Sequence, residues 1–127
     1  MLKVLIVGIG GFIGSILRYL LSGVSQNLFK AVTFPIGTLI VNILGCFVIG
    51  FLSILAEYRN AFNDFIRTML FIGVLGGFTT FSSFSNETFN LFREGDTVLA
   101  IVNIFVQIAG GLLFVWFGRL TAYSIWR

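Results

Sequence analysis

Apolar and polar residues alternate along this chain in long blocks rather than in short periods. Four apolar runs cover residues 4–21, 36–56, 66–92 and 98–123, and polar stretches separate them. Each run is close to the roughly 20 residues that a helix needs to cross the hydrocarbon core of a bilayer. The pattern therefore predicts one all-α membrane domain over residues 1–127, with four transmembrane helices and both termini on the same side.

The polar stretches indicate where these helices end. The first connector is expected to run from Ser22 to Pro35, so that the first helix ends before it. Asp64 precedes the third run, where its carboxylate is expected to cap the helix start by accepting backbone N–H groups. Residues 93–96 (REGD) predict a short turn between the last two runs.

The third run differs from an ordinary spanning helix in its middle. Gly76 and Gly77 are adjacent, and residues 78–87 then interleave two threonines and three serines with phenylalanines. Small residues permit a break, and hydroxyl groups satisfy the backbone groups that a break frees. Irregular backbone at membrane depth is tolerated only inside protein or beside a water-filled path, so we expect a third helix broken mid-membrane. The alternative is a glycine-rich loop between two helices, although each half would be too short to span alone.

Composition supports a membrane protein and argues against several functional classes. The chain is 57% hydrophobic and 10% charged, whereas soluble domains carry about 25% charged residues. It has no histidine, and its single cysteine, Cys46, cannot form a disulfide within the chain. The basic residues are spaced singly, and no paired carboxylates lie within an apolar run. We therefore expect a multi-pass protein of the cell inner (plasma) membrane that is neither an enzyme nor a nucleic-acid-binding protein.

The basic residues hardly define the orientation of the chain in a membrane. The side with the termini would carry Lys3, Arg59, Arg67, Arg119 and Arg127. The opposite side would carry Lys30 and Arg93, with Arg18 near that boundary. Because cytoplasmic loops are enriched in lysine and arginine, this distribution favours cytoplasmic termini only slightly. Such a chain could insert both ways, and four helices do not easily enclose a path, so we expect an oligomer.

A glycine pattern in the first run has two interpretations. Gly8, Gly11 and Gly14 follow an apolar stretch, as in the dinucleotide fingerprint of oxidoreductases. That fingerprint needs a carboxylate about 20 residues further on, and residues 30–36 contain no acid. The favoured interpretation is that these glycines let another helix approach closely.

Three amides and a hydroxyl lie within apolar runs. Thr38 and Asn42 are four residues apart in the second run, and Asn103 and Gln107 are four apart in the fourth, so each pair shares a helix face. Each amide could form an interhelical hydrogen bond or present a donor to a permeating anion. The two stacked amides of the fourth run favour a polar track.

Two charged residues also have alternative roles. Glu87 is the one carboxylate expected well within a span, so a proton-coupled transporter would use it as its titratable group. Otherwise it is a carboxylate near the interface that accepts hydrogen bonds from hydroxyls. Arg18 either extends to the interface or lies in a wet vestibule and attracts anions.

Three strings in the chain together resemble one family. They are residues 17–19 (LRY), residues 37–42 (GTLIVN) and residues 76–87 (GGFTTFSSFSNE). Over nearly its whole length the chain is similar to the Fluc/CrcB fluoride channels. The resemblance implies a passive fluoride-selective channel that exports cytoplasmic fluoride and lowers its toxicity. It also implies an antiparallel, dual-topology homodimer with two pores, whose partners are a second copy, the fluoride ion and membrane lipid.

The resemblance assigns roles to matching residues. Pore-lining residues would be Thr38, Asn42, Thr80, Phe81, Ser83, Phe84, Glu87, Asn103 and Gln107, with Arg18 in a vestibule. A structural sodium ion (Na⁺) at the dimer centre would be bound by the backbone carbonyls of Gly76 and Thr79. Family members often carry tyrosine, serine or histidine where Asn103 and Gln107 stand. The fourth helix therefore keeps polar residues at these positions, but the residue types differ from those of the family.

The chemistry of fluoride fits these residue types. Fluoride is small, strongly hydrated and only an acceptor, so a pore must replace its water with donors, here the Asn42 amide and the Thr80 and Ser83 hydroxyls. Phenylalanine rings have a positive edge. Phe81 and Phe84 could therefore hold an anion weakly, as conduction requires.

Two other functions stay open from the sequence alone. One is a proton-coupled small-molecule exporter of the small multidrug type, with Glu87 as its proton carrier. The absence of an acid from the first run counts against it. The other is a membrane-bound oxidoreductase built on the glycine pattern of the first run.

Overall fold

The computed structural model describes residues 1–30, 33–58 and 61–125. Over these residues the regular elements are helices, in the order α1 (Leu2–Leu28), α2 (Ile36–Tyr58), α3 (Asp64–Arg67), η1 (Thr68–Val74), α4 (Leu75–Phe78), α5 (Phe81–Arg93) and α6 (Thr97–Ile125). Of the basic residues counted for orientation, Arg59 and Arg127 lie outside the described residues.

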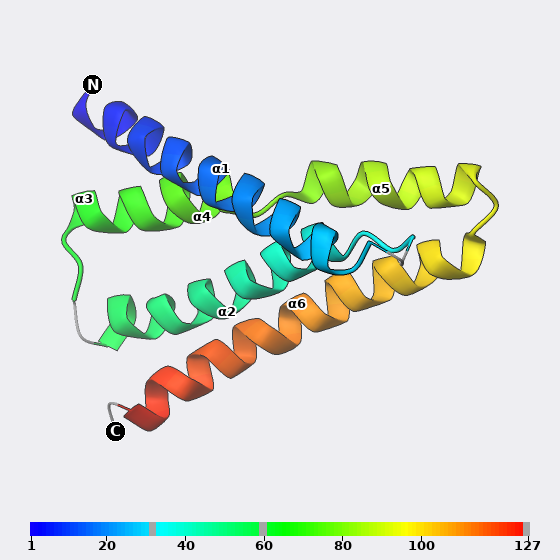
Figure 1. The fold of residues 1–127 in the computed structure, drawn as a ribbon. Helices are drawn as coiled ribbons and strands as arrows, with labels where there is room; N and C mark the ends of the chain where they lie inside the picture. The colour runs from blue at the N-terminus through cyan, green and yellow to red at the C-terminus, as the bar shows by residue number, and fades with distance from the viewer. Residues whose placement is uncertain (31–32, 59–60, 126–127) are drawn as a thin grey trace.

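Helical stretches long and apolar enough to cross a membrane match the predicted architecture. In the described part of the chain there are four, Leu2–Leu28, Ile36–Tyr58, Asp64–Arg93 and Thr97–Ile125. The third stretch comprises α3, η1, α4 and α5. Both termini lie at the end of the molecule that holds α3, and the turn from α5 to α6 lies at the other end (Figure 1). The prediction of an all-α protein with four membrane-spanning helices is confirmed.

The first helix is longer than its apolar run, so the prediction that the connector begins at Ser22 is wrong. α1 continues to Leu28. The Gln26 side chain accepts a hydrogen bond from the Gly37 N–H (3.1 Å) and donates one to the Phe34 carbonyl (3.4 Å). Gln26 near the end of α1 therefore holds the chain that enters α2, which a hydropathy pattern does not reveal.

The cap of the third stretch also differs from the prediction. Asn63, not Asp64, is the N-cap, and its Oδ1 accepts a hydrogen bond from the Ile66 N–H (2.9 Å). Asn63 has the extended backbone (ψ 167°) that lets a capping side chain reach the first turn. Asp64 is already helical and forms an ion pair with Lys3 of α1.

The third stretch is interrupted at two threonines. Thr79 has ψ 156° and Thr80 has φ −148°, both extended, whereas Gly76 and Gly77 are helical within α4. Thr80 is the N-cap of α5, and its Oγ1 accepts a hydrogen bond from the Ser83 N–H (3.2 Å). The irregular conformation therefore lies at the threonines and not at the glycines, and Gly77 instead serves packing against α1.

Glycines let α1 pack against η1 and α4. A Cβ atom at Gly14 would lie 2.1 Å from the Val74 carbonyl oxygen, and one at Gly77 would lie 2.6 Å from the Gly11 carbonyl oxygen. The predicted close approach is thus confirmed at Gly14. It is wrong for Gly8 and Gly11, where a Cβ would meet nothing within 4 Å, and the contact at the Gly11 carbonyl depends on Gly77. Small residues allow this packing because they bring two backbones together.

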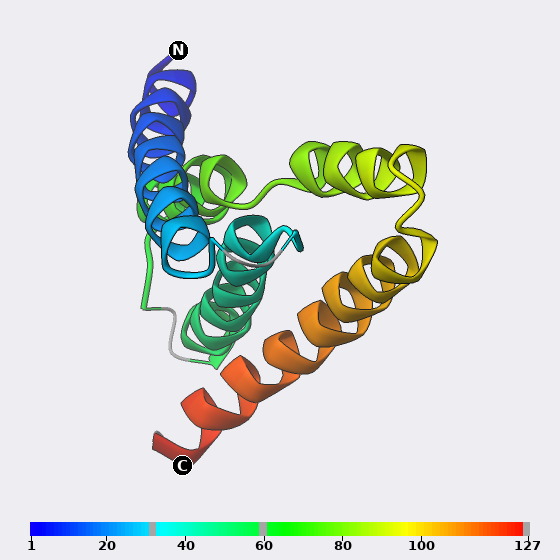
Figure 2. The ribbon, with the colours of Figure 1, turned by 45° about the vertical axis from the view of Figure 1, so that its right-hand side comes forward.

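The second close helix pair is α2 with α6. A Cβ at Gly50 would lie 2.2 Å from the Val115 carbonyl oxygen, and one at Gly118 would lie 2.1 Å from the Phe47 carbonyl oxygen. In the turned view of Figure 2, α5 and α6 converge at the turn that joins them. α1 and α4 lie on the side of α2 that is away from α6. The turn contains Gly95 at φ 89°, a left-handed conformation that favours glycine.

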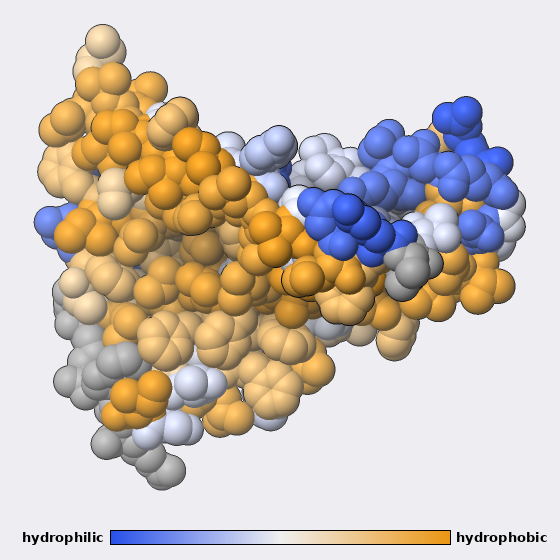
Figure 3. All heavy atoms as spheres, in the orientation of Figure 1, coloured by the Kyte–Doolittle hydropathy of each residue, from blue (hydrophilic) through white to orange (hydrophobic). Residues whose placement is uncertain are grey.

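Hydropathy is unevenly spread over the surface. Most of the visible face is apolar, whereas hydrophilic atoms gather over α5 and the C-terminal end of α1 (Figure 3). Ser82, Ser85 and Asn86 are exposed on α5. An apolar exterior suits lipid. A polar helix face within a membrane-spanning stretch requires a partner other than lipid.

The α1 packing gives a direct test. Gly14→Ala should lower the free energy of unfolding by about 1–3 kcal/mol, because its methyl group has no room beside the Val74 carbonyl. Thermal unfolding in detergent measures the loss. Gly8→Ala is the matched control, since it adds the same methyl group on the same helix into open space. Equal unfolding temperatures for the two variants would contradict the close packing.

Candidate functional site

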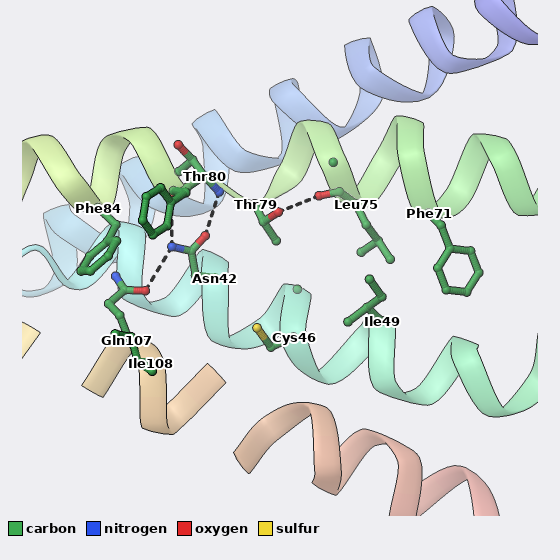
Figure 4. A pocket seen from close by; sticks show the side chains of 13 residues that line it. Asn42, Cys46, Ile49, Phe71, Leu75, Thr79, Thr80, Phe84, Gln107 and Ile108 are labelled. Atoms are coloured by element: carbon green, nitrogen blue, oxygen red, sulfur yellow. Dashed lines mark hydrogen bonds between the residues drawn. The ribbon is translucent and has the colours of Figure 1, made fainter. Parts of the chain in front are cut away.

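Asn42 of α2 lies beside the interruption in the third stretch and bonds to its backbone. Its Oδ1 accepts a hydrogen bond from the Thr80 N–H (2.8 Å), and its Nδ2 donates to the Thr80 carbonyl (3.1 Å) (Figure 4). Nδ2 also donates to Gln107 Oε1 of α6 (3.1 Å). In a continuous helix the Thr80 N–H would bond to the Gly76 carbonyl. The Asn42 side chain therefore takes the place of a helical neighbour.

This geometry changes the role expected for Asn42. Both hydrogens of Nδ2 are used, one on Thr80 and one on Gln107. The interhelical hydrogen bond considered from the sequence is present. An anion could take the Asn42 donor only by displacing one of these acceptors.

A first hollow, here called the phenylalanine hollow, opens beside the interruption and has a volume of about 360 Å³. Its lining residues are Asn42, Gly45, Cys46, Ile49, Phe71, Leu75, Gly76, Thr79, Thr80, Phe81, Phe84, Gln107 and Ile108. The rings of Phe81 and Phe84 have centroids 5.4 Å apart and meet edge to face at 65°. Phe84 is 8% exposed and Phe81 77% exposed, so one ring is fixed in the fold and the other faces outward.

A second hollow, here called the hydroxyl hollow, has a volume of about 430 Å³. Its lining residues are Ser15, Arg18, Tyr19, Ser22, Gly23, Thr38, Val41, Thr80, Ser83 and Glu87. Thr38 Oγ1 donates to Glu87 Oε1 (2.6 Å), which ties α5 to α2. Thr80 Oγ1 donates to Ser83 Oγ (3.0 Å), so the Ser83 hydroxyl hydrogen is not used in that pair.

The predicted pore residues thus form two groups that meet at Thr80, which lines both hollows. Asn42, Phe81, Phe84 and Gln107 belong to the phenylalanine hollow. Thr38, Ser83, Glu87 and Arg18 belong to the hydroxyl hollow. From the sequence, these residues are expected to form one pore lining, whereas on α5 Phe81 and Phe84 share one face and Ser83 and Glu87 share another.

The two amides of α6 have different partners. Gln107 bonds to Asn42, whereas Asn103 donates from Nδ2 to Thr88 Oγ1 (2.8 Å) and is fully buried. Neither hollow is lined by Asn103. Thr88 is not identified as a candidate residue from the sequence, although its position four residues after Phe84 places it on the same face of α5.

Three buried side-chain atoms lack a hydrogen-bond partner among the residues that the structure describes. They are Glu87 Oε2, Asn103 Oδ1 and Gln107 Nε2. The first two are acceptors, and Gln107 Nε2 is a donor. Buried polar groups are almost always bonded, so the free Gln107 donor, beside Phe84 in Figure 4, is a candidate contact for an acceptor ligand.

The residues expected to bind sodium offer backbone oxygen rather than charged side chains. No cluster of histidine, cysteine, aspartate and glutamate in the described part of the chain could hold a metal ion. The Thr80 N–H, which would bond to the Gly76 carbonyl in a continuous helix, bonds to Asn42 Oδ1 instead. Gly76 is exposed and Thr79 is half-buried. Free carbonyls suit a hard cation such as Na⁺, so these two positions fit the expected ligand type, although one chain supplies only part of a coordination shell.

Comparisons with known proteins place the chain in a family. A family profile described as "CrcB-like protein, Camphor Resistance (CrcB)" matches residues 5–119. The chain belongs to the CrcB-like family. The resemblance noted from the sequence is therefore confirmed, and CrcB-like proteins with an assigned function can be compared directly.

Curated relatives of this CrcB-like protein carry one functional name. A protein of Methanosarcina acetivorans named "Fluoride-specific ion channel FluC 1" is 43% identical over 125 residues, which cover 98% of this chain and 94% of the relative. The "Fluoride-specific ion channel FluC" of Ruminiclostridium cellulolyticum is 46% identical over 125 residues, 98% of this chain and 95% of its own. That of Aquifex aeolicus is 42% identical over 119 residues, 94% and 95% of the two chains. Together with the four apolar helices, these relatives establish a multi-pass membrane protein.

The bonds of Asn42 predict the effect of removing its amide. Asn42→Leu should lower the free energy of unfolding by about 1–3 kcal/mol, because the Thr80 N–H and carbonyl lose their partners. Amide hydrogen exchange of the peptide around Thr80 should also become faster. Ser53→Ala serves as the control, since the Ser53 hydroxyl bonds to the Ile49 carbonyl of its own helix. Unchanged exchange near Thr80 would show that Asn42 does not support the interruption.

Proposed function

We propose that this chain forms a passive fluoride channel that lets cytoplasmic fluoride leave the cell across the plasma membrane. The observation that carries the proposal is the phenylalanine hollow, where the free Gln107 donor lies beside a pair of aromatic rings. The names of the curated relatives support the same anion. Hydrogen fluoride crosses membranes as a neutral molecule and ionises in a near-neutral cytoplasm. The membrane potential then drives the anion out with about 2.3 kcal/mol per 100 mV.

The proposed route uses weak and repeated contacts. Fluoride would be stripped of water beside Arg18 and the Ser83 hydroxyl of the hydroxyl hollow, and would pass Thr80 to reach the phenylalanine hollow. There Gln107 Nε2 and the positive edges of Phe81 and Phe84 would replace its hydration shell. Binding that is favourable but weak at each position is what conduction requires.

An antiparallel, dual-topology homodimer would complete the two pores. A single chain leaves the Phe81 ring 77% exposed and leaves Ser82, Ser85 and Asn86 of α5 uncovered. These polar groups cannot face lipid at membrane depth, and a second copy would cover them. The slight difference in basic residues between the two sides of the membrane agrees with insertion in both orientations.

A structural sodium ion at the dimer centre is part of the proposal. The Gly76 carbonyl has lost its helical partner, and its position at the open phenylalanine hollow would let a second copy add the same oxygens. A central cation would hold two inverted copies together and lower the barrier for a nearby anion.

A proton-coupled small-molecule exporter is the alternative, with Glu87 as the titratable group. The carboxylate accepts a hydrogen bond from Thr38 and its Oε2 has no partner, so it could bind a proton. The curated relatives described above, which are named as fluoride channels, do not favour this function.

Fluoride efflux from liposomes tests the proposal. Liposomes loaded with potassium fluoride and carrying the purified protein should release fluoride when valinomycin opens a path for potassium, whereas protein-free liposomes should not. The efflux should ignore an imposed pH gradient. An efflux that needs the gradient and disappears in Glu87→Gln would support the exporter instead.

Phe81→Ile and Phe84→Ile should each cut the flux about tenfold or more while the protein stays folded, because isoleucine has no positive ring edge.

The free donor gives a sharper prediction. Gln107→Met keeps the length of the side chain but removes the amide, so fluoride efflux should fall about tenfold or more, as expected when about 1.4 kcal/mol of anion stabilisation is lost. Ile108→Met is the control, because Ile108 lines the same hollow without a donor. Wild-type efflux from Gln107→Met would remove Gln107 from the route.

A further inference from the structure

α5 is a polar helix whose position depends on few apolar contacts. Its buried residues are Phe84, Thr88 and Leu91, which lie on one face. The backbone hydrogen bonds of α4 end at Thr79, whose N–H bonds to the Leu75 carbonyl (3.0 Å), and the Thr80 N–H bonds to the Asn42 side chain rather than to α4. Side-chain hydrogen bonds to neighbouring helices must therefore define how far α5 is rotated.

One of these bonds joins α5 to α6 at the turn that follows Phe84. Thr88 Oγ1 donates to the Phe84 carbonyl (2.8 Å) and accepts from Asn103 Nδ2 (2.8 Å). Asn103 is fully buried and Thr88 is 6% exposed, so water does not compete for this bond. The hydroxyl thus connects α6 directly to the backbone of the residue that carries the inner ring of the phenylalanine hollow.

We infer that Asn103 and Thr88 act as a positioning pair that fixes the Phe84 ring. The inference rests on the proposed fluoride pathway, and it gives Asn103 a task different from lining the pore. Gln107 lies four residues further along the same face of α6 and lines the hollow with Phe84. A bond that holds Thr88 to Asn103 therefore sets the separation between the Phe84 ring and the Gln107 amide.

The pair accounts for the unusual cost of a buried amide. Asn103 Oδ1 has no hydrogen-bond partner among the described residues, and a buried unpaired acceptor destabilises a fold. A leucine at this position would pack without that cost. The amide is nevertheless useful at this position if its nitrogen, Nδ2, controls the geometry of α5 through the bond to Thr88.

The test compares flux and stability in matched variants. Thr88→Val keeps the shape of the side chain and removes the hydroxyl, so fluoride efflux in liposomes should fall about threefold or more, and the ratio of fluoride to chloride efflux should change. Thr88→Ser restores a hydroxyl and should restore both quantities. Thr121→Val is the control, since the Thr121 hydroxyl bonds within its own helix to the Phe117 carbonyl, and Thr121 lies 18 residues along α6 from Asn103.

A second pair of variants separates positioning from general destabilisation. Asn103→Leu should reproduce the effect of Thr88→Val on efflux, while thermal unfolding in detergent shows whether the protein stays folded. If the pair acts through the ring, Thr88→Val should have no further effect on the efflux that remains in Phe84→Ile.

The outcomes are distinct. Wild-type efflux and selectivity in Thr88→Val would overturn the inference while leaving the fluoride channel intact. An equal loss in the Phe84→Ile background would also overturn it, because the pair would then act elsewhere. Absence of fluoride efflux from the wild-type protein would instead reject the proposed function, on which the inference rests.

Discussion

The amide of Asn42 holds the peptide group of Thr80, and the rest of the site depends on this contact. The interruption at Thr79 and Thr80 frees backbone groups that would be costly in a membrane without partners. Asn42 Oδ1 and Nδ2 bond to the Thr80 N–H and carbonyl, and so make the break compatible with burial. The same side chain reaches Gln107, so one residue connects three spanning segments. Thr80 lines both hollows, and Asn42 lines the phenylalanine hollow.

Packing of the first half of the third stretch is equally important, because the break can serve a site only if one side of it is fixed. Gly14 of α1 and Gly77 of α4 let the backbones of these segments come into contact. η1, a π-helix over Thr68–Val74, lies in this packed half. π-helical turns are frequent at functional sites. The rigid half thus ends at the interruption, and the polar half beyond it is positioned by side chains.

The second half illustrates how polar groups can specify a structure in an apolar solvent. Hydrophobic burial does not drive helices together in lipid, so packing and hydrogen bonds must determine their arrangement. Thr38 bonds to Glu87 from α2, and Asn103 bonds to Thr88 from α6. These bonds hold α5 from two sides. The positions of the Phe81 and Phe84 rings follow from this placement, because α5 carries both residues.

The sequence by itself determined the class of protein, the four spanning helices and the family, because long apolar runs and the string at residues 76–87 are local signals. It also identified about half of the residues that line the two hollows, among them Asn42, Thr80 and Glu87. Tertiary structure alone decided which partner each amide takes and where the interruption falls. Asn42 and Gln107 are 65 residues apart in sequence, and their contact depends on the rotation and tilt of two helices. Helical periodicity gives the face of each residue but not the angle at which two faces meet.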